Sequence, residues 1–147
     1  MAGELTLRVI TPDRIVVDEP VESVQIPALD GSMGILPRHA PMVAALQVGV
    51  LRYRGKSGEK VLFVSEGFAE VRDNLLRVVC EAGETAGEID EKRAREAEQR
   101  ARERLSRKGE AATAAETFDQ LRAEAALRRA LMRLKVLEYG SRDRVRS

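Results

Sequence analysis

Four arginines in the C-terminal part of the sequence have the spacing of an anion-binding site. Arg93 and Arg100 are seven residues apart and Arg129 and Arg133 are four apart, so each pair shares one face of a helix. An antiparallel packing of the two helices could bring the pairs together. Guanidinium groups bind phosphate through paired hydrogen bonds. The alternative is a solvated face of arginine and glutamate, and the spacing by itself leaves both open.

A second candidate is the Asp30–Pro41 stretch, which interrupts the periodic patterns around it. Its two glycines and two prolines are typical of a turn-rich loop. Its apolar side chains predict a shaped loop packed onto a scaffold, with or without a partner. The residues of interest in it are Met33, Ile35, Leu36, Pro37 and His39.

Patterns for catalysis and metal binding are weak. A zinc site typically needs three or four ligands, and the chain has one histidine and one cysteine. Asp30, Ser32 and His39 contain the residue types of a hydrolytic triad, but no nucleophile-elbow motif accompanies them. A Walker-type phosphate loop is also absent from the sequence. We therefore expect no catalytic residues and no metal site.

Residues 1–84 have the pattern of a domain made of short strands. Leu5–Ile10 and Gly49–Arg54 alternate apolar and polar residues, as half-buried strands do. Turn signals at Gly55–Gly58 and Asp73–Asn74 separate further β-rich runs. Many short strands with frequent turns predict an all-β sandwich or barrel.

Residues 85–147 form the second predicted unit, a helical hairpin with a short basic tail. Residues 90–108 contain neither proline nor glycine and are rich in alanine, glutamate and arginine, which favour helix. Asp90 is the expected N-cap of this helix. Its alanines recur at steps of three and four, giving a narrow stripe of small residues.

The second helix is predicted over residues 114–139. Thr113 and Glu116 have the spacing of a capping box, and Gly140 is the expected stop. The expected apolar stripe includes Phe118, Ala126, Ala130, Leu134 and Leu137. Two helices on a short connection pack as an αα-hairpin. Because alanine stripes bury little area, we expect a marginally stable appendage that can dock, open or refold.

Charge is distributed unevenly along the chain. Residues 1–84 carry 9 Lys/Arg and 12 Asp/Glu, whereas residues 85–147 carry 16 and 12. One functional class is therefore a β-sandwich adaptor whose basic hairpin binds nucleic acid, although the glutamates and an aromatic content of 3% argue against it. No apolar run approaches the roughly 18 residues of a membrane span, so we expect any membrane connection to go through another protein.

The sequence Gly31-x-Met33-Gly34-Ile35-Leu36-Pro37-x-His39-Ala40-Pro41 resembles the signature loop of the epsilon subunit of F-type ATP synthase. Thr11-Pro12, Gly67–Val71 and Val78-Val79 fall where that family has comparable residues. The resemblance implies an α+β fold, with an N-terminal β-sandwich followed by an antiparallel two-helix hairpin. It also implies a non-catalytic rotor subunit whose sandwich contacts the gamma subunit and the c-ring, with the Asp30–Pro41 stretch at or supporting one of these contacts.

The hairpin carries a second resemblance, to the ATP-binding motif of some bacterial epsilon subunits. Ile89-Asp90-x-x-Arg93-Ala94 and Leu127–Leu134 match its two segments. The residues implied in a regulatory ATP site are Glu84, Ile89, Asp90, Arg93, Arg100, Arg129 and Arg133. In this site the arginines would neutralise phosphates, Glu84 and Asp90 would accept from the adenine amino group or ribose hydroxyls, and Ile89 would contact the base.

The resemblance further implies a switch. Folded against the sandwich, the hairpin would leave the complex free to run. Extended along gamma, its second helix would meet the catalytic alpha and beta subunits and block ATP hydrolysis. Bound ATP would stabilise the folded form, no cofactor being otherwise required, and the expected location is the cytoplasmic face of a bacterial plasma membrane, as part of the complex.

Overall fold

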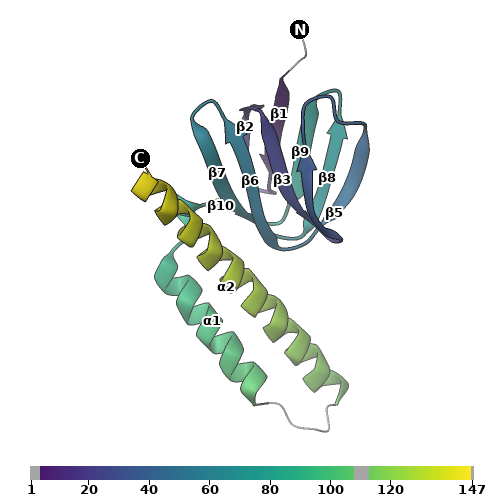
Figure 1. The fold of residues 1–147 in the computed structure, drawn as a ribbon. Helices are drawn as coiled ribbons and strands as arrows, with labels where there is room; N and C mark the ends of the chain where they lie inside the picture. The colour runs from purple at the N-terminus through teal and green to yellow at the C-terminus, as the bar shows by residue number, and fades with distance from the viewer. Residues whose placement is uncertain (1–3, 108–112, 147) are drawn as a thin grey trace.

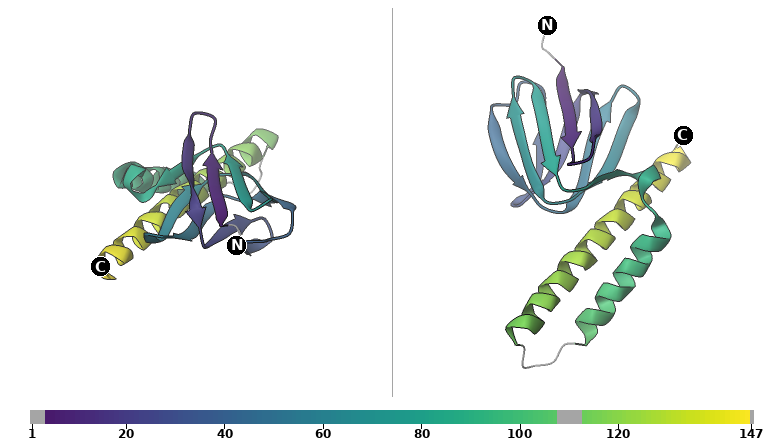
Figure 2. Two further views of the ribbon diagram at one scale, coloured as in Figure 1. Left: turned by 90° about the horizontal axis from the view of Figure 1, so that it is seen from above. Right: turned by 180° about the vertical axis from the view of Figure 1, so that it is seen from behind.

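The computed structural model describes residues 4–107 and 113–146, with side chains as far as residue 142. Strands fill the N-terminal part of the described chain, and two helices follow it (Figure 1). The helices project as a hairpin from the end of the sandwich opposite to the N-terminus, and they run side by side (Figure 2). The expected α+β architecture, an all-β unit followed by an antiparallel helical hairpin, is confirmed.

The strands form one hydrogen-bonded sheet that bends on itself around the core. Their order is β10-β7-β6-β3-β5-β8-β9-β1-β2, and β4 pairs with β3 beside this path. Neighbours are antiparallel except β1 and β9, which are parallel. The strands are β1 (Leu5–Ile10), β2 (Ile15–Val21), β3 (Ser23–Ala28), β4 (Gly31–Ile35), β5 (Met42–Leu46), β6 (Gly49–Gly55), β7 (Gly58–Val64), β8 (Gly67–Arg72), β9 (Leu75–Cys80) and β10 (Gly83–Thr85).

The alternation in the sequence corresponds to the two faces of these strands. In β1, Leu5, Leu7 and Val9 are fully buried while the residues between them are half-buried. The β8–β9 turn is also where the sequence places it: Asp73 and Asn74 have φ values of 50° and 58°. Two successive left-handed residues match the twist of the flanking strands in a two-residue hairpin. These local predictions are confirmed.

The Asp30–Pro41 stretch is not one loop, and this part of the prediction is wrong. Gly31–Ile35 is strand β4, which pairs antiparallel with β3. Ile35 is fully buried and Met33 packs against the core. Gly31 follows the turn at residues 29–30 with a φ of 125°, as a turn glycine does, whereas Gly34 lies inside this edge strand and marks no turn. Only residues 36–41 connect β4 to β5 without regular structure.

Two helices follow, α1 (Glu91–Ser106) and α2 (Ala114–Arg146). Asp90 caps α1, since its Oδ1 accepts a 3.1 Å hydrogen bond from the Arg93 N–H. The expected capping box is present on α2: the Thr113 N–H donates to Glu116 Oε2 at 3.0 Å, and the Glu116 N–H donates to Thr113 Oγ1 at 3.1 Å.

The second helix is longer than expected, because it continues through Gly140 to Arg146. A Cβ at Gly140 would lie 3.2 Å from the Cβ of Ala86, in the short 3-10 helix η1 (Ala86–Glu88). The glycine therefore permits a close approach between α2 and η1 instead of ending the helix. A 2.8 Å ion pair between Glu138 and Arg142 supports the turn that includes it.

Phe118 is not in the apolar stripe of α2, contrary to expectation. It is 61% exposed, whereas the buried residues of the helix–helix seam are alanines. Phe118 precedes the buried Ala123 by five residues, which turns its side chain about 140° away from the seam. The buried alanines are Ala94, Ala101, Ala123 and Ala130.

Candidate functional site

The hairpin meets the sandwich at a joint formed by residues 83–90. A small apolar cluster lies there and consists of Val48, Phe63, Ile89 and Val136. Phe63 and Val136 are fully buried, and Ile89 exposes 8% of its surface. In this state Ile89 therefore packs the joint and does not offer a free surface to a base.

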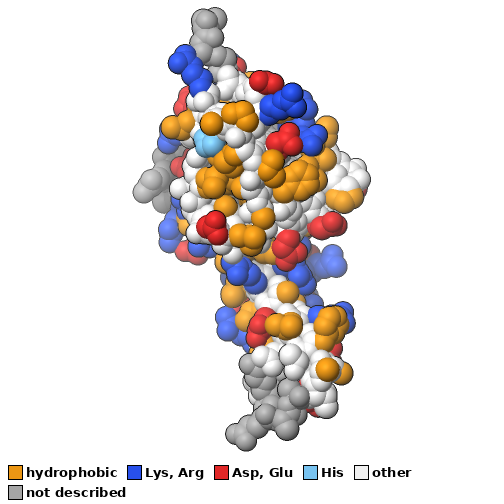
Figure 3. Space-filling model, turned by 90° about the vertical axis from the view of Figure 1, so that its right-hand side faces the viewer, with side chains coloured by type: hydrophobic (Ala, Val, Ile, Leu, Met, Phe, Trp, Pro, Cys, Tyr) orange, Lys and Arg blue, Asp and Glu red, His pale blue; other side chains and the backbone are white. Residues whose placement is uncertain are grey.

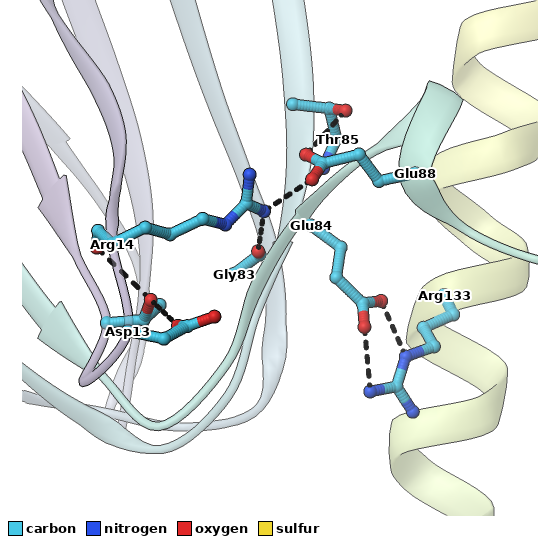
Figure 4. A network of polar contacts seen from close by, with 8 residues as sticks. Asp13, Arg14, Gly83, Glu84, Thr85, Glu88 and Arg133 are labelled. Atoms are coloured by element: carbon cyan, nitrogen blue, oxygen red, sulfur yellow. Dashed lines mark hydrogen bonds and ion pairs between the residues drawn. The ribbon is translucent and has the colours of Figure 1, made fainter.

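Glu84 and Arg133 come together at this joint and pair with each other (Figure 4). Arg133 Nε donates to Glu84 Oε2 at 2.8 Å and Nη2 donates to Oε1 at 3.2 Å, which is a bidentate ion pair. The Arg133 guanidinium also lies 4.4 Å from the centroid of the Phe63 ring. Each of the two charged side chains exposes a little over a quarter of its surface. The pair links strand β10 to α2, across 49 residues of sequence.

The other predicted arginines occupy one side of the helix–helix seam. Each stands one residue before a seam alanine, in the pairs Arg93–Ala94, Arg100–Ala101 and Arg129–Ala130. Because α1 and α2 are antiparallel, positions that precede seam residues flank the seam on the same side. Arg93 and Arg100 are exposed and Arg129 is half-buried. Within the described residues, none of these three forms an ion pair.

A second polar link at the joint was not foreseen from the sequence. Arg14 Nη2 lies 2.5 Å from Glu88 Oε2 and donates to the Gly83 carbonyl at 3.1 Å (Figure 4). Glu88 also accepts from the Thr85 N–H and hydroxyl, at 3.1 and 2.9 Å. Burial acts to raise the pKa of Glu88, but these hydrogen bonds and the Arg14 charge outweigh it, so the pKa is lowered. The Thr-x-x-Glu spacing was the available signal for the cap, whereas nothing local indicated Arg14.

The loop after β4 is tied to the opposite hairpin turn. Arg38 has a left-handed backbone with φ 67°, and its N–H donates to Asn74 Oδ1 at 2.6 Å. The His39 N–H donates to the Leu36 carbonyl at 3.2 Å, and His39 Nδ1 is 2.7 Å from the Ala40 carbonyl oxygen. Leu36 is 61% exposed. The loop therefore presents an apolar side chain on a backbone that hydrogen bonds hold in place.

The five residues predicted for this interface have different surroundings. Ile35 exposes none of its surface, so its side chain belongs to the core and can only support a contact from below. Met33 is half-buried against the core and supports the loop from beneath. Leu36 is exposed, and Pro37 and His39 are half-buried.

Apolar side chains also lie exposed on the outer face of β5 and β8. Val43 is 70% exposed and Phe68 39%. Ala45, on the same face as Val43, is the cross-strand partner of Phe68. Figure 3 views the molecule from this side and shows hydrophobic side chains gathered over the sandwich. We call Val43, Ala45 and Phe68 the apolar face; a surface of this kind is typical of a protein contact.

Candidate catalytic groups are not brought together in the described structure. His39 bonds to backbone, while Ser32 is an exposed residue of β4. Burial raises the pKa of the Cys80 thiol to about 11, which keeps it protonated at neutral pH. The described residues contain no cluster of three or more His, Cys, Asp or Glu suited to a metal ion. None of the described helices has the length and apolar character needed to cross a membrane.

Comparisons with known proteins divide the chain at the same joint. Residues 4–86 match the model of the ATP synthase delta/epsilon chain β-sandwich domain, and residues 88–138 match that of the delta/epsilon chain long α-helix domain. The chain is 48% identical over 135 residues to the ATP synthase epsilon chain of Symbiobacterium thermophilum, covering 90% of this chain and 92% of that one. It is 43% identical over 136 residues to the epsilon chain of Nitratidesulfovibrio vulgaris, covering 92% and 97%.

Solved structures show the same fold at lower identity. A chain of the Euglena gracilis mitochondrial ATP synthase superposes with a TM-score of 0.73 at 24% identity, covering 93% of this chain and 81% of that one. A chain of the Tetrahymena thermophila mitochondrial ATP synthase superposes with a TM-score of 0.58 at 14% identity, covering 92% of this chain and 97% of that one. Both family models match, and relatives above 40% identity align over nearly their whole length. The chain therefore belongs to the epsilon-subunit family of F-type ATP synthases.

Proposed function

We propose that this chain is a non-catalytic subunit of the rotor, in which the sandwich binds the gamma subunit and the c-ring and transmits proton-driven rotation. The apolar face and the exposed Leu36 support this assignment, because they are surfaces that a partner would cover. The two similar solved chains come from assemblies described as OSCP/F1/c-ring and central stalk/c-ring. The chain would then meet the membrane only through the complex, at the cytoplasmic face of a bacterial plasma membrane.

The hairpin is the regulatory part of this proposal. The observation that carries it is the small attachment of α2 to the sandwich: one apolar cluster, the Glu84–Arg133 and Arg128–Gln47 pairs, and the stacking of Arg52 on Tyr139. A helix held by so few contacts can leave its site at a modest cost in free energy. Extended along gamma, its basic face would contact the alpha and beta subunits and inhibit ATP hydrolysis. The folded form described here would be the permissive one.

Regulatory ATP would act on the folded form. The arginines flanking the seam and Arg133 supply positive charge for phosphates, while Glu84 and Asp90 supply acceptors for the base or ribose. In this structure Arg133 is already occupied by Glu84. ATP would therefore exchange the ion pair, taking Arg133 for a phosphate and leaving the Glu84 carboxylate free to accept from the nucleotide. Binding at about a hundred times Kd would stabilise the folded hairpin by ~2.7 kcal/mol.

Calorimetric titration of the full chain with ATP tests the nucleotide proposal. Arg129→Ala should weaken binding by about tenfold or more, the worth of a charged hydrogen bond. Arg95→Ala is the matched control, since Arg95 is an exposed arginine of α1 that pairs with Glu91 and lines the other side of the hairpin. No binding up to millimolar ATP, or equal weakening in both variants, would reject the ATP site.

Assembly tests the rotor proposal separately. Phe68→Asp places a charge on the apolar face and should abolish co-purification with gamma. Ile15→Asp is the control, because Ile15 is 58% exposed but lies on β2, beyond β9 and β1 in the sheet. If the Phe68→Asp variant still co-purifies with gamma, gamma binds a surface other than the apolar face. Loss in both variants would point to general destabilisation, which thermal unfolding of the isolated chains would reveal.

The rate of ATP hydrolysis by reconstituted complexes tests the regulatory role of the hairpin. Val136→Ala removes two methyl groups from the cluster that holds α2 and should shift the hairpin towards the extended state. Complexes reconstituted with this variant should hydrolyse ATP more slowly than those with the wild-type chain. Unchanged or faster hydrolysis would contradict the assignment of the folded hairpin as the permissive state.

A further inference from the structure

A cavity lies between α2 and the sandwich, and it is lined by none of the residues of the proposed ATP site. The cavity measures 330 Å³ and is bounded by α2 and by residues of β3, β4 and β6. The helix contributes one stripe at spacings of three and four residues. This stripe consists of Arg128, Met132, Lys135 and Tyr139.

Three of the side chains around this cavity are cationic, namely Arg52, Arg128 and Lys135, and none of its lining residues is acidic. The groove between the helices on the other side of the hairpin differs, because Glu91, Glu98 and Glu138 line it together with cations.

Two of the three cations are held in place by neighbours that do not neutralise them. Arg128 Nη2 donates to Gln47 Oε1 at 2.5 Å, and Gln47 Nε2 in turn donates to the Ala28 carbonyl at 3.0 Å. The Arg52 guanidinium stacks 3.9 Å from the centroid of the Tyr139 ring. Both arginines therefore keep hydrogen-bond donors and full charge available for a ligand.

We propose that this cavity binds a small phosphate-bearing anion, with Arg52, Arg128 and Lys135 as its cationic ligands. Guanidinium forks match phosphate oxygens, and lysine adds a point charge. Gln25 and Ser32 supply further polar groups at the wall. The cavity is distinct from the ATP site proposed above, and either site can exist without the other.

An occupant of this cavity would act on the hairpin. Arg128 and Lys135 belong to α2, whereas Arg52 belongs to β6. A ligand that contacts all three joins the helix to the sandwich and is lost when α2 leaves. It therefore binds the folded hairpin and not the extended one, and it stabilises the folded form by mass action.

Titration of the full chain with inorganic pyrophosphate tests this proposal. Lys135→Gln and Arg128→Gln should each weaken binding by about tenfold, from loss of one charged contact. Arg122→Gln is the matched control, because Arg122 is an exposed arginine of α2 outside the cavity. ADP in a parallel titration distinguishes the sources: tighter binding than pyrophosphate, lost in the same variants, identifies a nucleotide as the occupant, and equal binding identifies a free phosphate compound.

Amide chemical shifts locate the bound pyrophosphate. The proposal expects the largest changes around Gly49 and Tyr139, and it expects Arg133→Gln to leave binding intact. Changes centred on Glu84 and Arg133 would assign the anion to the ATP site and overturn the cavity proposal. Absence of saturable binding in the millimolar range, or equal weakening by Arg122→Gln, would overturn it as well, whereas failure of ATP binding alone would not affect it.

Discussion

The sandwich and the hairpin are stabilised by very different amounts of apolar contact. The sandwich core consists mostly of leucine, isoleucine and valine side chains with exposed fractions of 0–8%. The seam between α1 and α2 is built on buried alanines. An alanine methyl removes far less apolar surface from water than a leucine side chain, and hydrophobic stabilisation is proportional to that area.

The attachment of the hairpin to the sandwich also buries few large apolar side chains. The large buried side chains that join α2 to the sandwich form one cluster around Phe63 and Val136. Polar contacts lie beside this cluster: the Glu84–Arg133 and Arg128–Gln47 pairs. We therefore expect the sandwich to be the stable body of the molecule and the hairpin to open at a lower free energy than global unfolding.

The largest expected effect comes from the sandwich core. Leu7→Ala removes a fully buried side chain of β1, which lies between β2 and β9. The free energy of unfolding should fall by about 2–5 kcal/mol, because the substitution leaves a cavity in a packed core. Urea denaturation measures this. Val43→Ala, at a residue 70% exposed, should change it little; similar losses in both would contradict the contrast.

A smaller and local effect is expected at the attachment. Val136→Ala should lower the free energy of detaching α2 from the sandwich by about 1–3 kcal/mol, since two buried methyl groups are lost. Amide hydrogen exchange of α2 should accelerate while exchange in β1 and β9 stays unchanged. Leu121→Ala, at a residue of α2 that is 58% exposed, is the control. Equal acceleration in the strands would mean that the two parts unfold together.

The ion pair at the joint should contribute less. A double-mutant cycle with Glu84→Gln and Arg133→Gln should give a coupling energy of about 0.5–1 kcal/mol, because a partly exposed pair is screened by solvent. The readout is again hydrogen exchange in α2. The Glu91–Arg95 pair, with side chains 58% and 64% exposed, provides the comparison and should show weaker coupling. A coupling of zero at Glu84–Arg133 would mean that this ion pair contributes nothing to holding α2 on the sandwich.

Acid should loosen the joint before the sandwich core. The pKa of Glu88 is lower in the folded chain than in the unfolded one, so its contribution is present at neutral pH and is lost as the pH falls through the folded pKa, below 4.5. Exchange in α1 should therefore accelerate in this range. Glu88→Gln should remove that part of the pH dependence. A wild-type profile that the substitution does not alter would assign the acid sensitivity to other carboxylates.

Local rules predicted the elements whose physics is local. The period-2 pattern of β1, the left-handed turn at Asp73–Asn74 and the helix caps at Asp90 and Thr113 all depend on residues within a few positions of one another. The same rules failed at Gly34 and Gly140. Each glycine was interpreted as an interruption, but one lies in an edge strand and the other lies against η1.

The candidate site was predicted only in part, for the same reason. Its residue types and helix faces follow from spacing, because in antiparallel helices the positions before the seam alanines flank the seam on one side. The partner of Arg133 does not follow from spacing, since Glu84 is 49 residues away. Burial of Ile89 and Ile35 likewise depends on what packs against them.

The sequence by itself determined the division into sandwich and hairpin, the ends of most elements and the family. These depend on periodicity, capping and motifs, which are short-range properties of the chain. Only the tertiary structure decided which charges pair and which stay free. Glu84 neutralises Arg133, and Arg14 reaches Glu88, whereas Arg52, Arg128 and Lys135 meet around a cavity without a carboxylate. The reason is physical: a charge is paired or left free by the angle and register at which α2 docks on the sandwich, and no local pattern encodes these.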